Sequence, residues 1–313
     1  MNQEVRLRSF FVPLWLLTLG VPLIVVSLLI LSSTTVEYLI RKVFRKDFSK
    51  LSKKFEKKGE SWSKAKKDTL RKINHVFIFI GLFIIWYIGL FVVNFYAGTS
   101  AGMVPEENNM FLLYLRIIDE PNAITEVLFS LGWFYYLLFF FFYSFFLFMI
   151  ANEFTRKSRF CSFPFNFFPK LYLSGKEKKN YGTYLYFTIG QMFAAFICPP
   201  MVLFSILGIS SISDLVTSQI GIRFGKKHIL WNQNKTWEGT IAGIITTFFL
   251  CFFFVGFLWS LIFTLLFLLF DIFTNKPINL SDNLLIPVGC SLTYIFIRFI
   301  FDLNYYTIFL SWF

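Results

Sequence analysis

The chain has 313 residues, of which 56% are hydrophobic and only 15% are charged, a balance that excludes an ordinary soluble domain. Its four cysteines are scattered without a CxxC pair, which argues against a disulfide framework and a zinc site. Together with the formal net charge of +12, this composition predicts a membrane protein with strongly basic loops.

Apolar segments long enough to cross a membrane recur along the chain, since a span needs about 20 mostly apolar residues. The candidates lie at 10–31, 75–97, 124–150, 182–199, 200–220 and 284–301. The run 240–273 is too long for one span and short for two. We read it as a tight hairpin that turns near Gly256, with a single kinked or partly re-entrant helix as the alternative. The fold class predicted is therefore an all-α integral membrane protein with about eight transmembrane helices.

The first apolar segment is too long for the core of a signal peptide and is followed by no small-residue cleavage site, so we expect a retained helix. Basic residues gather at 41–72, 152–181 and 221–238, whereas 98–125 is net acidic. The positive-inside rule then places the three basic segments in the cytoplasm and both chain ends outside. We divide the chain into an N-terminal helix with a basic segment (1–72) and a polytopic membrane domain (73–313).

The basic segment 41–72 contains an amphipathic pattern. Phe44, Phe48, Leu51 and Phe55 recur at helical spacing, lysines surround them, and the pattern ends near Gly59. Such a helix suits the surface of an anionic membrane. Nucleic acid is the other common partner of a basic run, but the flanking spans favour lipid headgroups.

The stretch 213–240 places a carboxylate, glycines and lysines between apolar segments. Asp214 has apolar neighbours on both sides, so its burial would need a compensating cation or donors. Lys226 could be a purely structural partner, but the nearby Gly-x-x-Phe-Gly-Lys-Lys at 221–227 favours a shared site for a metal and phosphate. No Gly-x-x-x-x-Gly-Lys-Ser/Thr occurs, which excludes a P-loop.

Other polar residues stand at the ends of predicted spans. Arg71 and Lys72 could simply anchor the helix end, whereas His75, as an ionisable group at a span entrance, should face protein or water. Glu153 and Arg156 have the spacing of a surface pair on a helix. Asp271 and the pair Asp282-Asn283 would alone be ordinary cap or loop residues, but five acids at one membrane face exceed what capping requires.

In combination and order, these motifs resemble those of the CTP-dependent polyprenol kinases, the family of dolichol kinase, phytol kinase and the yeast-type diacylglycerol kinase, which are related to the CDP-diacylglycerol synthases. The resemblance extends from about residue 71 to the last span. The positions that match the family's motifs are Arg71, Lys72 and His75; Glu153 and Arg156; 182–190; Ser213, Asp214, Thr217, Ser218, Gly221, Phe224, Gly225 and Lys226; Lys235 to Thr240; and Asp271, Asp282, Asn283, Leu284 and Pro287. Ser213 stands in place of the family's glycine, Thr217 in place of its usual alanine, and Asp271 where glutamate is common.

The resemblance implies phosphoryl transfer from CTP to the hydroxyl of a membrane lipid, such as dolichol, another polyprenol or diacylglycerol. Asp214, with Asp282 and Asp271, would hold Mg²⁺ or another divalent cation, and Lys226 and Lys235 would neutralise the transferring group. Glu238 would orient a lysine or a metal-bound water, and His75 is the candidate base. The remaining residues expected to bind the nucleotide or its phosphates are Gly221, Gly225, Lys227, Thr236, Gly239, Arg71 and Lys72.

Two other functions remain open at this point. A phosphatidate cytidylyltransferase shares part of the 214–239 pattern, although its His-Gly-Gly and Asp-Arg-x-Asp elements are missing here. A non-catalytic transporter or scaffold would explain the spans but not the clustered motif. The resemblance further implies a multi-pass protein with a cytoplasmic site, in the endoplasmic reticulum membrane of a eukaryote or the cell membrane of a prokaryote. The sequence identifies neither the acceptor lipid nor the oligomeric state.

Overall fold

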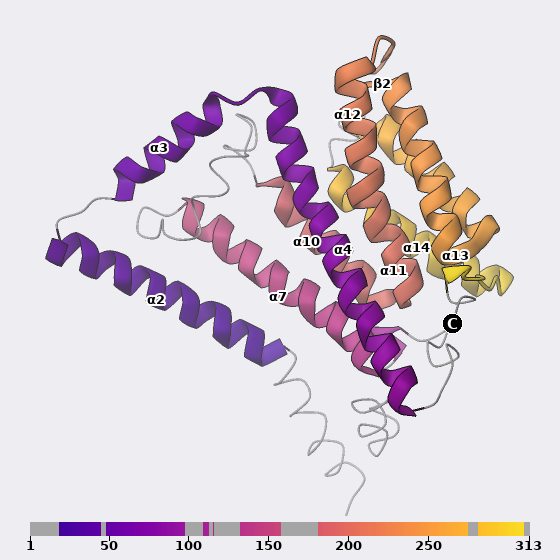
Figure 1. The fold of residues 1–313 in the computed structure, drawn as a ribbon, viewed down its shortest axis with the longest axis horizontal. Coiled ribbons are helices and arrows are strands. Elements are labelled where there is room, and N and C mark those ends of the chain that lie inside the picture. Colours follow the sequence, from indigo (N-terminus) through magenta and orange to yellow (C-terminus); the bar gives the residue numbers. More distant parts are fainter. Residues whose placement is uncertain are drawn as a thin grey trace, which may run out of the picture.

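The computed structural model describes residues 19–44, 48–97, 109–112, 115, 132–157, 181–274 and 281–309, and these residues are almost all helical. Figure 1 shows most of the helices gathered in one bundle, with α2 and α3 extending from it as an arm. The main elements are α2 (Val21–Phe44), α3 (Phe48–Glu60), α4 (Lys64–Ala97), α7 (Gly132–Lys157), α10 (Thr183–Ile197), α11 (Pro200–Gly208), η4 (Ile209–Ser213), α12 (Asp214–Phe224), β1 (His228–Ile229), β2 (Asn232–Thr236), α13 (Trp237–Phe273) and α14 (Asp282–Phe301).

Six helices of the described part are long and apolar enough to cross a membrane, which supports a multi-pass membrane protein. They are Val21–Val43, Ala65–Val92, Leu137–Arg156, Pro200–Phe224, Trp237–Phe273 and Asp282–Phe301. The predicted span at 182–199 is the shorter apolar helix α10. The total of about eight spans stays a prediction. The first span differs most from expectation, because its described helix reaches Phe44 and thus lies further along the chain than 10–31.

The long run 240–273 forms the predicted hairpin. Thr240, near the start of α13, donates a hydrogen bond through Oγ1 to Oδ2 of Asp271, near its end, at 2.6 Å. A straight helix would separate these residues by about 46 Å. The chain reverses at Gly256, whose φ of +79° and ψ of −177° define a backbone conformation open essentially to glycine alone. The hairpin therefore brings both ends of α13 to the same end of the bundle.

The centre of the bundle is the composite helix α11–η4–α12, and 78% of the residues in its most apolar stretch are buried. The chain passes from α-helical to π-helical geometry at η4, one turn that ends immediately before Asp214. Around this helix lie buried aromatic rings, with Phe204 packed edge-on against Phe79 and stacked on Phe254. A π-helical turn inside a helix is frequently found at a functional site.

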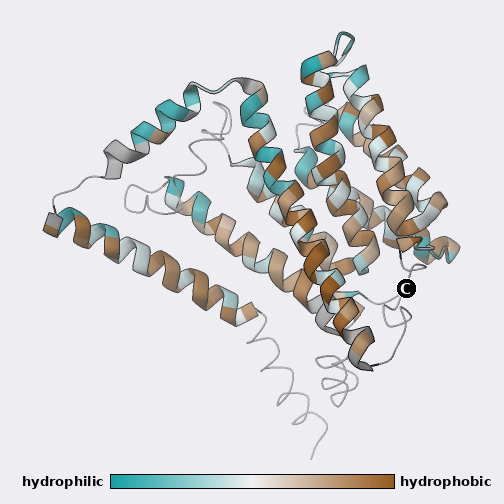
Figure 2. Ribbon diagram, in the orientation of Figure 1, coloured by the Kyte–Doolittle hydropathy of each residue, from teal (hydrophilic) through white to brown (hydrophobic). Residues whose placement is uncertain are grey.

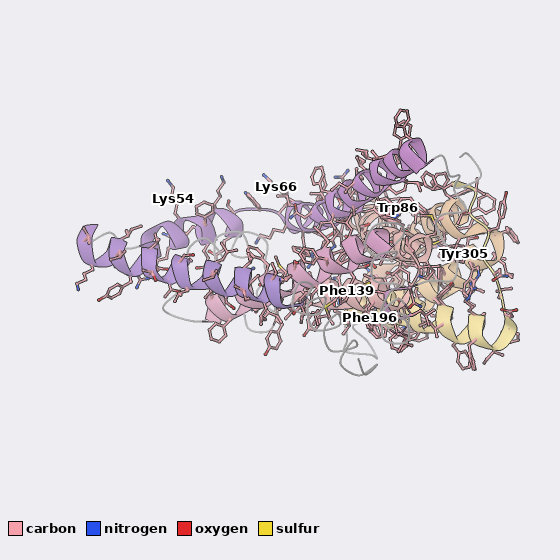
Figure 3. All side chains as sticks on the ribbon, turned by 90° about the horizontal axis from the view of Figure 1, so that it is seen from below. Lys54, Lys66, Trp86, Phe139, Phe196 and Tyr305 are labelled. Carbon is pink, nitrogen blue, oxygen red and sulfur yellow. The ribbon has the colours of Figure 1, made fainter. Side chains whose placement is uncertain are left out.

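The polar surface is concentrated at one end of the structure. Figure 2 shows hydrophilic residues along α3, at the start of α4 and around β1 and β2, with hydrophobic residues filling the opposite end. Figure 3 shows Lys54 and Lys66 pointing away from the ribbon, while Trp86, Phe139, Phe196 and Tyr305 lie in the bundle. In α3, Phe55 is half-buried; the side chains of Phe44, Phe48 and Leu51 lie outside the described residues.

The one exception to an all-α fold in the described residues is a two-stranded antiparallel hairpin, β1–β2. Asn232 is buried there, and its Nδ2 donates to the carbonyl oxygens of Ile272 at 3.2 Å and Thr274 at 2.7 Å. These bonds fasten β2 to the end of α13. As a result, Lys235 projects from β2 toward Asp271.

Candidate active site

Asp214, at the start of α12, is buried and forms an ion pair with Lys72 of α4. Lys72 Nζ lies 2.7 Å from Asp214 Oδ1 and 3.0 Å from the Asp214 carbonyl oxygen. Both side chains are less than a tenth exposed. Lys226, the structural partner suggested by the sequence, cannot make this contact, because α12 rises about 15 Å from Asp214 to Phe224 and Lys226 lies beyond its end.

A second lysine, Lys235, is mostly buried and joins the ends of two helices. Its Nζ lies 2.5 Å from Asp271 Oδ1 at the end of α13 and 3.4 Å from Asp282 Oδ2 at the start of α14. Burial alone would lower the pKa of Lys235, but the carboxylates of Asp271, Asp282 and Asp214 outweigh burial and raise this pKa above its usual value. Lys235 is therefore held as a cation among aspartates.

Asp68, which was not among the predicted site residues, completes the cluster. Its carboxylate accepts from Arg71 at 2.7 Å, lies 3.9 Å from Lys72 Nζ, and accepts a hydrogen bond from Ser218 Oγ. The positions of Asp68, Arg71 and Lys72, three and four residues apart in α4, could have revealed these pairs from the sequence. The four aspartates 68, 214, 271 and 282 thus face three cations, Arg71, Lys72 and Lys235.

His75 lies one turn after Lys72 and is buried. Its ring stacks on Phe187 of α10, with ring centroids 3.9 Å apart and an angle of 9° between the planes. The structure therefore places the predicted base beside the charge cluster, flat against an aromatic ring.

The predicted phosphate-binding glycines pack helices together. A Cβ on Gly239 would lie 2.6 Å from the Thr217 carbonyl oxygen and 3.1 Å from the Cα of Gly221, so these two glycines let α12 and α13 approach closely. A Cβ on Gly225 would meet the Gly221 carbonyl oxygen at 2.3 Å. Thr236 is the N-cap of α13 and accepts from the Gly239 N–H at 3.4 Å.

Lys226 and Lys227 are exposed at the turn between α12 and β1, away from the buried pairs. The carboxylate of Glu238 accepts from the backbone N–H of Lys227, at 3.1 Å to Oε1 and 3.3 Å to Oε2. Glu238 thus closes the β-hairpin against α13 through the Lys227 backbone. These residues form the rim of the site, whereas Lys72 and Lys235 form its floor.

Glu153 and Arg156, predicted as a surface pair, are instead a mostly buried pair with Nη2 and Oε2 2.6 Å apart. The other carboxylate oxygen of Glu153 accepts from the Gly182 N–H at 2.9 Å and from the Tyr184 hydroxyl. Thr183 lies between these two residues in the sequence, and its Oγ1 accepts a hydrogen bond from Nη1 of Arg71 at 3.5 Å. The pair therefore fixes the start of α10 beside the charge cluster.

The three aspartates predicted to hold a metal lie in one neighbourhood but do not form a group of three ligands. Lys235 lies between Asp271 and Asp282, and Lys72 is bound to Asp214. Within the described residues, no three His, Cys, Asp or Glu side chains are close enough to surround one ion. Asp214 and Asp282 are nonetheless near enough for each to affect the charge of the other.

Comparison of this chain with protein-family models, with curated proteins and with solved structures found no match. Its resemblance to the polyprenol kinases therefore depends on the motif residues alone.

Proposed function

We propose that this chain is a lipid-alcohol kinase that transfers a phosphoryl group from CTP to the hydroxyl of a membrane lipid. The observation that carries the proposal is the buried cluster of alternating charge contributed by α4, α12, β2, α13 and α14. Buried ion pairs are a poor means of stabilisation, because desolvation of the charges offsets their attraction. Ionisable groups among apolar spans are expensive and usually serve a function.

The donor chemistry of the cluster suits a magnesium ion. Mg²⁺ in phosphoryl-transfer sites is usually bound by one or two carboxylates together with the phosphates of the substrate, so a group of three protein ligands is not required. Asp214 and Asp282 are the neighbouring carboxylates that would hold it, with Asp271 paired to Lys235 behind them. A bound Mg²⁺ would supply neutralisation of charge on the triphosphate.

The lysines and Arg71 divide into two groups with different tasks. Lys226 and Lys227 on the rim would attract the triphosphate from solvent, since exposed cations raise the local concentration of an anion. Lys72 and Lys235 lie where solvent is largely excluded, with the partly exposed Arg71 beside them, and fixed cations in such a place stabilise charge on a transferring phosphoryl group most strongly. The buried aspartates hold these cations in place before substrate arrives.

His75 would accept the proton of the lipid hydroxyl. An imidazole nitrogen can accept a proton from a hydroxyl group, and His75 lies one helical turn from Lys72. The acyl or prenyl chain of the substrate would lie between the apolar helices. In this proposal the site faces the cytoplasm, in the endoplasmic reticulum or the cell membrane, and residues 41–72 contact the anionic membrane surface.

The proposal is tested by giving the purified protein labelled CTP with dolichol, geranylgeraniol, phytol, diacylglycerol and phosphatidate in turn. Release of CDP with a phosphorylated alcohol is the expected result. Formation of a CDP-lipid with release of pyrophosphate would instead identify a phosphatidate cytidylyltransferase. If no lipid is modified, while an Asp214→Asn control behaves identically, the kinase proposal is wrong and a transporter or scaffold is favoured.

A further inference from the structure

Three buried polar side chains next to the charge cluster have no hydrogen-bond partner within the described residues. They are His75 through Nδ1, Gln191 through both its amide oxygen and its amide nitrogen, and Ser213 through Oγ. Gln191 and Ser213 are fully buried, and His75 is 5% exposed. Buried polar groups in proteins are nearly always paired, so such a gathering indicates that a ligand or ordered water completes it.

These side chains come from helices that meet beside the cluster. Phe187, on which His75 stacks, and Gln191 are four residues apart in α10, so they lie on the same helix face. Ser213 is the last residue of η4 and directly precedes Asp214, whose partner Lys72 lies one turn from His75. The turn η4 contacts both α4 and α14, and the stacking of His75 on Phe187 joins α4 to α10.

The start of α14 encloses the same region. A Cβ on Gly190 would lie 2.4 Å from Pro287 Cγ and 3.0 Å from the Asn283 carbonyl oxygen. Because residue 190 is a glycine, the first turn of α14, which contains Asp282, can approach α10 closely at the position next to Gln191. Gln191 thus belongs to a segment of α10 that carries Phe187, the stacking partner of His75, and that packs at Gly190 against the first turn of α14.

The side chains of Gln191 and Ser213 are neutral, and that of His75 can be neutral. Together the three unpaired groups offer both hydrogen-bond donors and acceptors. The Gln191 amide provides both, the Ser213 hydroxyl provides both, and a neutral His75 accepts at the unprotonated nitrogen. This set matches a hydroxyl group, which donates one hydrogen bond and accepts others. It does not match a phosphate monoester, which would need cations, because none of the three unpaired groups is a permanent cation.

The surroundings favour a hydroxyl that is attached to an apolar body over a cluster of water. Phe79, one turn beyond His75 in α4, is buried against Phe204 and Phe254. Ala194, the next residue on the Gln191 face of α10, is also fully buried and small. The unpaired polar groups are therefore bordered by apolar side chains.

We propose that His75, Gln191 and Ser213 form the subsite that binds the hydroxyl of a neutral long-chain alcohol. This inference rests on the proposed kinase function and specifies its acceptor class, since an anionic lipid would be excluded. Gln191 fixes the hydroxyl oxygen and His75 Nδ1 receives its hydrogen bond. The hydroxyl is thereby held beside Asp214 and Lys72, where the phosphoryl group would arrive.

The test uses the full chain in nanodiscs without nucleotide, and geranylgeraniol as the probe. The expected result is a rise in Tm with geranylgeraniol and a clearly smaller rise with its methyl ether, which cannot donate to His75. In Gln191→Met we expect a higher Tm without ligand, because unpaired buried groups are removed. The same variant should lose most of the alcohol-induced shift, and its KM for the alcohol should rise roughly 10-fold while CTP affinity is unchanged.

Gln219→Met is the matched control, because Gln219 of α12 is also without partners at its amide but lies on a different helix. It should keep the full response to the alcohol. Equal stabilisation of the wild type by the alcohol and its ether, or an unchanged response in Gln191→Met, would overturn the subsite. If Gln191→Met does not fold, the alcohol and ether arms on the wild type decide the question alone.

Failure of the subsite and failure of the kinase proposal give different results. Phosphorylation of an alcohol that is insensitive to Gln191→Met would remove the subsite and leave the kinase. Binding of the alcohol that depends on Gln191, without any phosphoryl transfer from CTP, would keep the subsite and remove the kinase.

Discussion

The helix α2 of the arm and the composite helix at the centre of the bundle are both apolar, yet they differ in how much of them is buried. In the most apolar stretch of α2 only 6% of the residues are buried, whereas in the most apolar stretch of Pro200–Phe224 78% of the residues are buried. Both helices carry serines, threonine and an acid, but Glu37 of α2 pairs with Arg41 of its own helix, whereas Asp214 pairs with Lys72 of α4. Hydropathy therefore indicates that a helix can enter a membrane, but the partner of its acid distinguishes the helix that packs inside the bundle.

Charge differs between the two regions in the same way. The lysines of α3 at positions 53, 54, 57 and 58 are exposed, so water or lipid headgroups can solvate them. In the bundle, Lys72 and Lys235 are enclosed and are neutralised by aspartates from other helices. Replacing a lysine should therefore change the free energy of unfolding little in the arm and strongly in the bundle.

The largest effect is expected from the Lys72–Asp214 pair. Asp214→Asn should lower turnover at least about 100-fold, because a carboxylate at the reacting centre is lost. It should also lower the free energy of unfolding by about 3–5 kcal/mol, because Lys72 is left buried without its partner. Turnover and Tm of the purified variant measure the two effects.

The double variant Lys72→Met with Asp214→Asn separates stability from catalysis. It should regain most of the lost Tm, because no unpaired charge remains, but none of the turnover. A single Asp214→Asn variant that melts like the wild type would show that the pair is not buried as described.

The second prediction contrasts Lys235 on the floor of the site with Lys226 on its rim. Lys235→Met should lower stability by about 3–5 kcal/mol, because Asp271 loses its buried partner. Lys226→Met should change stability by no more than about 0.5 kcal/mol, while weakening CTP binding several-fold. Thermal unfolding and CTP titration compare them, and equal stability losses would contradict the division into floor and rim.

The sequence predicted the helical class, most span positions and the hairpin at Gly256, because these depend on local apolar length and on one glycine. It also identified Asp214, Lys235, Asp271, Asp282 and Lys72 as polar residues at span ends. It did not predict which of them pair, since pairing depends on how α4 packs against α12 and how β2 docks on α13. The suggestion of Lys226 as a partner for Asp214 failed for that reason.

Residues outside recognisable motifs were the hardest to find. Asp68 lay in a lysine-rich segment, and its charge was outnumbered there. Glu153 and Arg156 have the spacing of a solvent-exposed pair, and only the docking of α10 on α7 makes them buried. Gln191 offered one signal, an amide within an apolar span, which requires a partner or a ligand inside the bundle.

The third prediction concerns the hairpin that closes the site. Gly256→Ala should destabilise the protein by about 1–3 kcal/mol, because the new Cβ requires a strained positive φ and would lie 2.6 Å from the Tyr306 carbonyl oxygen. Gly81→Ala is the control, since no atom lies within 4 Å of its Cβ and alanine is favoured inside a helix. A Gly256→Ala variant at least as stable as Gly81→Ala would argue for a continuous helix in place of the hairpin.

The smallest effect on the bundle is expected from the lysines of α3. Replacing Lys53, Lys54, Lys57 and Lys58 by Gln should weaken contact with an anionic membrane, where each lysine contributes about 1 kcal/mol. Amide hydrogen exchange across 48–60 should be slowed by anionic nanodiscs in the wild type but not in the variant. Turnover measured in neutral nanodiscs should stay within about twofold, because these side chains are exposed and make no ion pair with the cluster in the described structure. A loss of turnover there as large as that of Lys235→Met would mean that the arm belongs to the site.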